Sequence, residues 1–316
     1  MRIRTGLCVA ALAASFGAAG TPAKPLRVPF DFSRSEIGVN ATIKRTPVYV
    51  LIDTGVDPSV IDLKRAYALH QKMDLHDIGE GTGTGSGKPA AAYPATIDGL
   101  AIGGRAFGPI EALATDVGPI SAHYGRRLDA VLGYSFLKDK IVLVDYPAHT
   151  VTFLDGTGDA SVLTKRCRAH WTARMDMLKD ENWPLITQFR IGAATFPATL
   201  DTGSNSAITL YKGAPDLPGM RAALASKGAT SSTGFQGKSD LKTFTLNAPA
   251  GFGPFLLPPG ETVTLRDVKG SSSTSYANIG NKLFAALTPK MLLDYRAHTE
   301  TFFGQCTPGV VRARLR

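Results

Sequence analysis

The chain of 316 residues is 44% hydrophobic and 19% charged, which excludes an intrinsically disordered protein and allows one large core or two cores of about 150 residues each. Its net charge of +9 comes from 35 basic and 26 acidic residues, but the basic residues form no stripe interleaved with aromatic residues, so nucleic-acid binding is not predicted. After the N-terminus there is no run of about 18 apolar residues, so no membrane-spanning helix is predicted either.

The first predicted element is a secretory signal peptide over residues 1–23. Arg2 and Arg4 precede an apolar stretch of small residues, and the small residues around 18–23 resemble a cleavage site. The alternative is a buried N-terminal helix, but the stretch is not amphipathic and contains several glycines. Cys8 lies before the apolar stretch, so no lipid anchor is expected. We therefore expect a periplasmic or secreted protein with a charge of +7 once both arginines are removed.

The rest of the chain is predicted to be mostly β. Alternating or continuous apolar runs are bounded by Gly, Pro and Asn at spacings typical of short strands. The clearest predicted strands cover residues 48–52, 141–144, 150–154, 185–191 and 290–293. Short helices are predicted over residues 59–72, 134–139, 218–227 and 282–288.

Landmarks of the first half recur in the same register in the second. An apolar residue followed by glycine, Leu132-Gly133 and Ile279-Gly280, places its glycine 80 residues after Asp53 and 79 residues after Asp201. The segment D-Y-P-A-H-T-V-T-F at 145–153 differs at only two positions from D-Y-R-A-H-T-E-T-F at 294–302. These repeats predict a diverged tandem duplication. The two predicted lobes are residues 24–158 and 159–316.

Each half contains the triplet D-T-G at the end of an apolar strand. The first copy is Asp53-Thr54-Gly55, and the second is Asp201-Thr202-Gly203, 148 positions later. A single D-T-G is weak support for a functional site, because Asp followed by Gly is common in turns. Two copies at matched positions of a duplication are strong support for a paired site.

These motifs resemble those of the aspartic protease superfamily, in particular a bacterial exported member built from two retropepsin-like halves. The resemblance covers nearly all of residues 30–303. It implies a bilobal, mostly β fold in which two lobes related by a pseudo-twofold axis each supply one D-T-G to a cleft. It further implies that Asp53 and Asp201 are the catalytic pair, and that Thr54 and Thr202 hydrogen-bond across the axis.

The residue types also make chemical sense by themselves. Amide hydrolysis needs an activated water and a proton for the leaving nitrogen, and two carboxylates that share one proton can supply both. Gly55 and Gly203 allow the two loops to approach closely. The sequence thus predicts an aspartic endopeptidase that acts on extended polypeptide, needs no cofactor, and is a monomer with an internal pseudo-dimer. The alternatives are two unrelated turn aspartates, or a degenerate relative that binds peptides without cleaving them.

The residue after each D-T-G differs between the halves. In the family this position often carries a hydroxyl that hydrogen-bonds the carboxylate, and the second half keeps Ser204 there. The first half has Val56 instead. We therefore expect the anion of Asp53 to be less stabilised than that of Asp201.

Glycine-rich segments at 79–88 and 228–237 lie where the family has its flap hairpins. The residues predicted to cover a substrate are Gly83, Gly85, Thr233, Gly234 and Phe235. Because neither segment shows clean hairpin alternation, two long solvated loops are the alternative.

The other candidate residues are cysteines and histidines. In an oxidising compartment Cys167 and Cys306 are a candidate disulfide, although two unrelated buried thiols are possible from spacing alone. No metal site is predicted, because the two histidines of the cluster His70, Asp74, His76 and Asp77 would lie on different faces of a helix. His149 and His298, in the equivalent A-H-T turns, are interpreted as hairpin residues.

Overall fold

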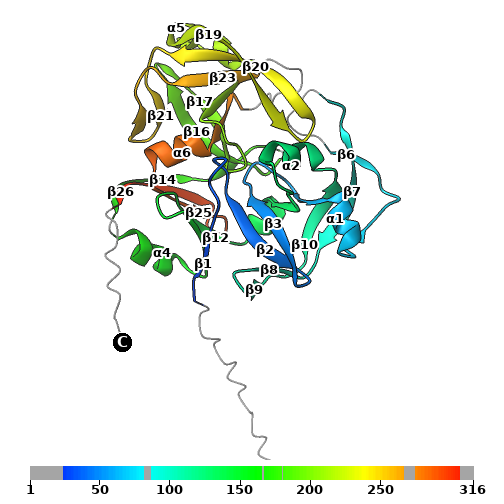
Figure 1. The fold of residues 1–316 in the computed structure, drawn as a ribbon. Helices are drawn as coiled ribbons and strands as arrows, with labels where there is room; N and C mark the ends of the chain where they lie inside the picture. Colours follow the sequence, from blue (N-terminus) through cyan, green and yellow to red (C-terminus); the bar gives the residue numbers. More distant parts are fainter. Residues whose placement is uncertain (1–23, 82–86, 166, 180, 267–274, 307–316) are drawn as a thin grey trace, which may run out of the picture.

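The computed structural model describes residues 24–81, 87–165, 167–179, 181–266 and 275–306. The described chain is mostly β, as predicted, and folds into three sheets that are all visible in Figure 1. Two ten-stranded sheets each come from one half of the chain, and a six-stranded sheet takes strands from both. In this described part there is no helix long and apolar enough to cross a membrane.

The first ten-stranded sheet builds the N-terminal lobe, with β6 paired to β7 beside the main path. In order across the sheet its strands are β5 (Lys72–Met73), β7 (Ala90–Ile97), β10 (Ile110–Thr115), β4 (Ser59–Asp62), β11 (Ala130–Leu132), β3 (Thr46–Ile52), β2 (Gly38–Ile43), β8 (Leu100–Ile102) and β9 (Arg105–Ala106), with β6 at Gly79–Gly81.

The second ten-stranded sheet has a matching order of strands. Its members are β19 (Leu224–Gly234), β20 (Gly237–Leu246), β23 (Thr262–Arg266), β18 (Ile208–Tyr211), β24 (Ala277–Gly280), β17 (Ala194–Asp201), β16 (Pro184–Ile191), β21 (Ala250–Phe252) and β22 (Phe255–Leu257), with β15 (Asp176–Met177) on β16. In both sheets the strand that ends at D-T-G pairs in parallel with the strand that ends at the later apolar-Gly turn. This shared topology is what a tandem duplication predicts.

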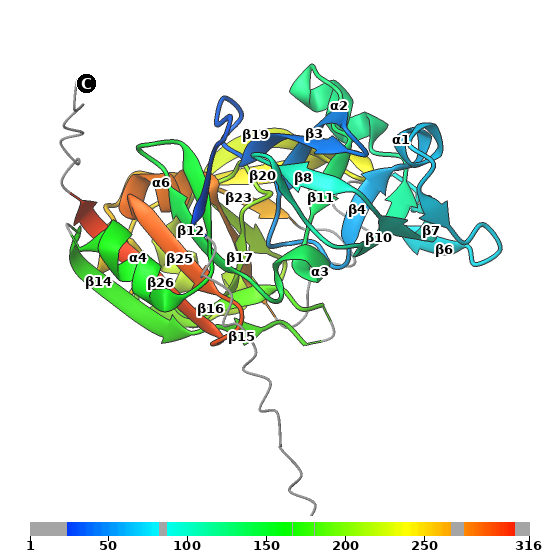
Figure 2. The ribbon, with the colours of Figure 1, turned by 90° about the horizontal axis from the view of Figure 1, so that it is seen from below.

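The six-stranded sheet joins the halves. Its order is β1 (Leu26–Pro29), β13 (Thr150–Leu154), β12 (Ile141–Asp145), β25 (Lys290–Asp294), β26 (Thr299–Cys306) and β14 (Cys167–Arg174). The two copies of the repeated D-Y-x-A-H-T segment form its central hairpins, and β12 pairs antiparallel with β25 through Leu143 opposite Leu292. Figure 2 shows β12, β25, β26 and β14 of this sheet from below. His149 and His298 occupy the hairpin turns with φ of 47° and 50°, in agreement with the prediction.

Short helices connect the strands. They are α1 (Leu63–Ala68), α2 (Gly118–Tyr124), α3 (Tyr134–Leu137), α4 (Thr157–Thr164), α5 (Met220–Ala223) and α6 (Asn281–Leu287), with a 3-10 turn at Ala214–Asp216.

Two of the predicted helices were too long. Residues 59–62 belong to β4, because the β-branched and apolar run S-V-I-D is buried on both sides and pairs with β10 and β11. Helix α5 ends at Ala223, where residues 224–234 continue as a long strand. In both places pairing within a sheet overrides the local preference of the segment.

Strand alternation sorts the buried residues into separate layers. Val48, Val50 and Ile52 of β3 face the main core, whereas Tyr49 and Leu51 belong to a second apolar cluster on the opposite face. Because successive side chains of a strand point to opposite faces, Asp53 follows Tyr49 and Leu51 onto the side of this second cluster. We call it the flap-side cluster. Its buried members are Tyr49, Leu51, Val60, Val117, Tyr124, Leu128 and Val131.

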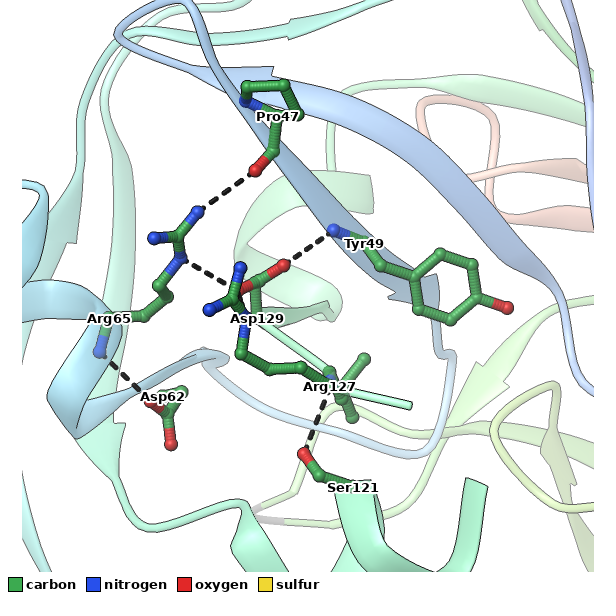
Figure 3. Close-up of polar contacts among 8 residues, drawn as sticks. Pro47, Tyr49, Asp62, Arg65, Ser121, Arg127 and Asp129 are labelled. Atoms are coloured by element: carbon green, nitrogen blue, oxygen red, sulfur yellow. Dashed lines mark hydrogen bonds and ion pairs between the residues drawn. The ribbon is translucent and has the colours of Figure 1, made fainter. Parts of the chain in front are cut away.

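A buried carboxylate ties the strands of the N-terminal lobe together (Figure 3). Asp129 is 2% exposed, and its oxygens accept hydrogen bonds at 2.8 Å from the Tyr49 backbone N–H and from the Arg65 Nε. Arg127 Nε lies 2.8 Å from the same carboxylate but is 63% exposed. Arg65 also donates to the Pro47 carbonyl at 2.9 Å. Asp129 thus holds β3, α1 and the chain before β11 in one register.

The predicted disulfide is present, and it closes β14 onto β26. Cys167 and Cys306 are opposite each other in the ladder and are bonded, at a sequence separation of 139. Because the bond restricts a long loop of the unfolded chain, we expect its removal to cost about 2–4 kcal/mol of unfolding free energy. Urea unfolding of the Cys167→Ser, Cys306→Ser double variant would measure this loss, and an unchanged midpoint would contradict it.

Candidate active site

The two D-T-G loops begin where β3 and β17 end, and each is fixed by its parallel neighbour. The Asp53 backbone N–H donates to the Leu132 carbonyl at 3.1 Å, and Asp201 lies opposite Gly280 in the β17–β24 ladder. Both aspartates therefore stand at the end of a central strand, surrounded by backbone that is already paired. The structure brings these two loops, 148 residues apart, into direct contact.

The threonines form a reciprocal network across the loops. The Thr54 hydroxyl donates to the Leu200 carbonyl at 2.6 Å and accepts from the Thr202 backbone N–H at 3.0 Å. The Thr202 hydroxyl donates to the Ile52 carbonyl at 2.9 Å and accepts from the Thr54 N–H at 3.1 Å. Both side chains are buried, at 2% and 1% exposure. The predicted hydrogen bonds across the pseudo-twofold axis are therefore present, in both directions.

The glycines bring the carboxylates together. The Gly55 N–H donates to Asp53 Oδ1 at 2.7 Å, and the Gly203 N–H donates to Asp201 Oδ1 at 2.9 Å. A Cβ at Gly203 would lie 2.0 Å from Asp53 Oδ2, and a Cβ at Gly55 would lie 2.7 Å from the Asp201 Cγ. Each carboxylate thus occupies the space above the glycine of the other loop, and any larger residue would displace it.

Burial raises the pKa values of both carboxyl groups. The pKa of Asp53 is raised well above its ordinary value, first by burial and then by the negative charge of Asp201. Burial also raises the pKa of Asp201, while a hydrogen bond from Asn278 opposes the rise. Two close carboxyl groups that cannot both ionise hold a proton between them, and their titration belongs to the pair. The site can therefore present one carboxylate and one carboxylic acid at the same time.

Comparison with known proteins agrees with this geometry. Residues 39–136 match the family model described as aspartyl protease. This match supports assignment to the aspartic protease superfamily. The matched residues include the first D-T-G and the apolar-Gly turn at 131–133, and they end before the second D-T-G. No curated protein matches the chain significantly.

The anion of Asp53 is less stabilised than that of Asp201, as predicted, but the side chains responsible differ from the predicted ones. The Ser204 hydroxyl lies 2.8 Å from the Ser206 hydroxyl, and the side chain that donates to the carboxylate is Asn278, whose Nδ2 is 2.5 Å from Asp201 Oδ2. Val56 packs against the flap-side cluster. The side chains of Ser204 and Val56 therefore do not set the difference between the two aspartates, because both are directed to other partners, but the Ser204 backbone N–H does help to lower the pKa of Asp201.

Asn278 was missed because it was treated only as part of an apolar-Gly turn. Aligning the two halves on Gly133 and Gly280 places Asn278 opposite Val131 of the first lobe. A polar residue at one of two equivalent, strand-interior positions was the signal that could have identified it.

We expect Asn278→Val to raise the pKa of Asp201, since it removes a donor that stabilises the anion. The acid limb of the pH–activity profile should move to higher pH. Val131→Asn, at the equivalent position of the first lobe, is the matched control. An unchanged acid limb in Asn278→Val would show that the Asn278 amide does not control the titration of the aspartate pair.

The second predicted flap is a hairpin, not a solvated loop. Strands β19 and β20 pair along their length, with Thr233 opposite Lys238 and Gly234 opposite Gly237. Phe235 at the tip packs against the flap-side cluster of the other lobe, and Figure 1 shows this hairpin reaching toward α2. The tip therefore covers the same face of β3 that carries Asp53.

The first predicted flap approaches the second. Gly83 and Gly85 lie outside the described residues, but β6 and β7 on either side of them are paired. The Gly87 N–H donates to the Gln236 carbonyl at 2.7 Å. The two glycine-rich segments thus meet near the tip of the β19–β20 hairpin.

The cluster of histidines and aspartates considered as a metal site, residues 70–77, lies in the turns that follow α1. His70 has a φ of 48°, and Asp74 Oδ1 accepts the His76 backbone N–H at 3.0 Å. Across the described ranges, no group of three or more His, Cys, Asp or Glu could hold a metal ion.

Proposed function

We propose that this protein is an aspartic endopeptidase and that Asp53 and Asp201 are its catalytic pair. The observation that carries the proposal is the placement of each carboxylate against the glycine of the opposite D-T-G loop, fixed by the reciprocal threonine bonds. Such a pair, which holds one proton, is suited to general acid–base chemistry near its own titration range.

The reaction proceeds in two proton-balanced steps. The ionised carboxylate takes a proton from water as the water oxygen bonds to the carbonyl carbon, and the other carboxyl group gives its proton to the carbonyl oxygen. In the tetrahedral intermediate one hydroxyl proton returns to the pair, the newly protonated carboxyl protonates the amide nitrogen, and the C–N bond breaks. The buried surroundings strengthen each of these charge interactions.

The flap hairpin indicates where an extended substrate would bind. A chain lying between the flap tip and the pair would contact Phe235 on one side and Asp53 and Asp201 on the other. Phe235 must leave the flap-side cluster to admit it. We propose that this movement opens the site to polypeptide segments without secondary structure, because an extended chain offers the thinnest cross-section.

Digestion of a reduced, alkylated protein between pH 3 and 7 tests the activity. We expect peptides from internal cuts, identified by mass spectrometry. Release of terminal residues alone would contradict endopeptidase action. Tight peptide binding without any cleavage at any of these pH values would instead favour the alternative function, a peptide-binding protein with the same fold.

We further propose export from the cytoplasm with removal of residues 1–23, which lie outside the described residues. The Cys167–Cys306 bond supports an oxidising compartment. N-terminal sequencing of the protein recovered from the producing cells tests it, and a first residue before about position 18 would contradict it.

A further inference from the structure

A third carboxyl group stands beside the catalytic pair. The antiparallel ladder of β2 and β3 places Gly38 opposite Leu51, and the Ile52 N–H donates to the Ile37 carbonyl at 3.0 Å. Continued by one residue, this register puts Glu36 next to Asp53. The prediction from sequence did not include Glu36, because it precedes a strand and belongs to no motif.

The Glu36 side chain is buried without a compensating charge. The residue is only 7% exposed, its Oε2 has no hydrogen-bond partner, and no ion pair is formed with it in the part of the chain that the structure describes. The Tyr124 hydroxyl faces it but is not in hydrogen-bond geometry. An isolated buried carboxylate is costly, so the group is either neutral or paired with a cation from outside.

The charges around Glu36 come from both halves. The pKa of Glu36 is raised to about 7, mainly by burial and to a smaller extent by the charge of Asp201, while the Tyr124 hydroxyl, Arg34 and Lys282 oppose the rise. Glu36 in turn raises the pKa values of Asp53, Tyr49 and Tyr124. Glu36 therefore interacts electrostatically with residues of both halves, including both members of the catalytic pair.

The second lobe carries a different residue at the equivalent place. In the β16–β17 ladder Leu185 lies opposite Thr199, so the same extension puts Trp183 next to Asp201. Its indole Nε1 is also buried without a partner. A substrate chain has a direction, and it therefore meets a carboxyl group beside one aspartate and an indole beside the other.

We propose that Glu36 is a specificity-determining residue that anchors a cationic side chain, lysine or arginine, of the polypeptide substrate. This inference rests on the proposed function and names its substrate class. The ammonium or guanidinium group would donate to the free Oε2, while its aliphatic stem lies along the flap-side cluster beside Tyr124. The orphaned carboxylate gains a partner only when substrate is bound, which favours chains that carry a cation at one position.

Peptide binding tests this inference independently of catalysis. The probe is a set of eight-residue peptides, each with either lysine or uncharged norleucine at one successive position, titrated at pH 8 into the Asp201→Asn protein. At one position lysine should bind about ten- to a hundredfold more tightly than norleucine, the usual gain of a charge-assisted hydrogen bond. In the Asp201→Asn, Glu36→Gln protein this ratio should fall to about one. Glu111→Gln, an exposed glutamate on β10, is the matched control and should keep the ratio.

The pH dependence provides a second measurement, one that needs no change at Glu36. Since only the ionised carboxyl group attracts a cation, the lysine preference should be weaker at pH 5 than at pH 8. Equal binding of lysine and norleucine peptides at every position, or a preference that survives Glu36→Gln, would overturn the inference. Absence of hydrolysis in the wild type would contradict the proposed function, while the binding ratio would still decide the role of Glu36.

Discussion

Asp53→Asn and Asp201→Asn should each reduce kcat for peptide hydrolysis by about a thousandfold or more, and the double variant should be no worse than either single one. Such non-additivity is expected of groups that act as one catalytic unit. Steady-state assays of the three variants on one peptide substrate measure it. The matched control is Asp62→Asn at the N-terminus of α1, where the side chain caps the helix and Asn is an equally good cap.

The thermal stability of Asp53→Asn should rise although its activity falls. Because burial and repulsion raise the pKa of Asp53 above its unfolded value, the folded state holds its proton more tightly than the unfolded chain does. The wild type therefore loses stability as pH rises from the unfolded pKa through the folded one, and an Asn variant does not. We expect Asp53→Asn to unfold at a higher temperature than the wild type at pH 7 and at a similar temperature at pH 3. Additive losses of stability and normal turnover would mean that the two aspartates are ordinary turn residues.

Asp129→Ala should lower the unfolding free energy by about 3–5 kcal/mol, which is the usual cost of removing one partner of a buried ion pair. The change leaves the Arg65 guanidinium, whose side chain is 13% exposed, and the Tyr49 N–H without their acceptor (Figure 3). Arg127→Ala is the control on the same carboxylate, and its loss should be below about 1 kcal/mol because that side chain is 63% exposed. Urea unfolding measures both, and equal losses in the two variants would contradict the assignment.

The part of the site that could be predicted from sequence is the part that recurs in both halves of the chain. Asp53 and Asp201 were found because a short polar motif recurs at matched positions, and Thr54 and Thr202 followed from the same triplets. The disulfide was identifiable because the predicted removal of residues 1–23 leaves only Cys167 and Cys306. His149 and His298 could be predicted as turn residues because the A-H-T segment that contains them occurs in both halves.

The features that escaped are those that occur once or depend on packing between distant segments. Asn278 and Glu36 each break the symmetry of the repeat, and each matters only because folding brings it beside a carboxylate 77 or 17 residues away in sequence. The strand at 224–234 was read partly as helix because its polar, glycine-containing run has little strand character of its own. Its pairing with β20 and the docking of Phe235 on the other lobe hold it extended.

The distinction between a peptidase and a peptide-binding protein depends on whether the pair recognises a tetrahedral carbon. A peptide in which the scissile amide is replaced by statine presents a hydroxyl at that place, and analogues of a transition state bind at least about a hundredfold more tightly than matched substrates. Calorimetric titration of the wild type should show such an advantage of the statine peptide over the same sequence with an ordinary amide, and Asp201→Asn should abolish it. Equal affinity of the wild type for both peptides would contradict the claim that Asp53 and Asp201 are catalytic.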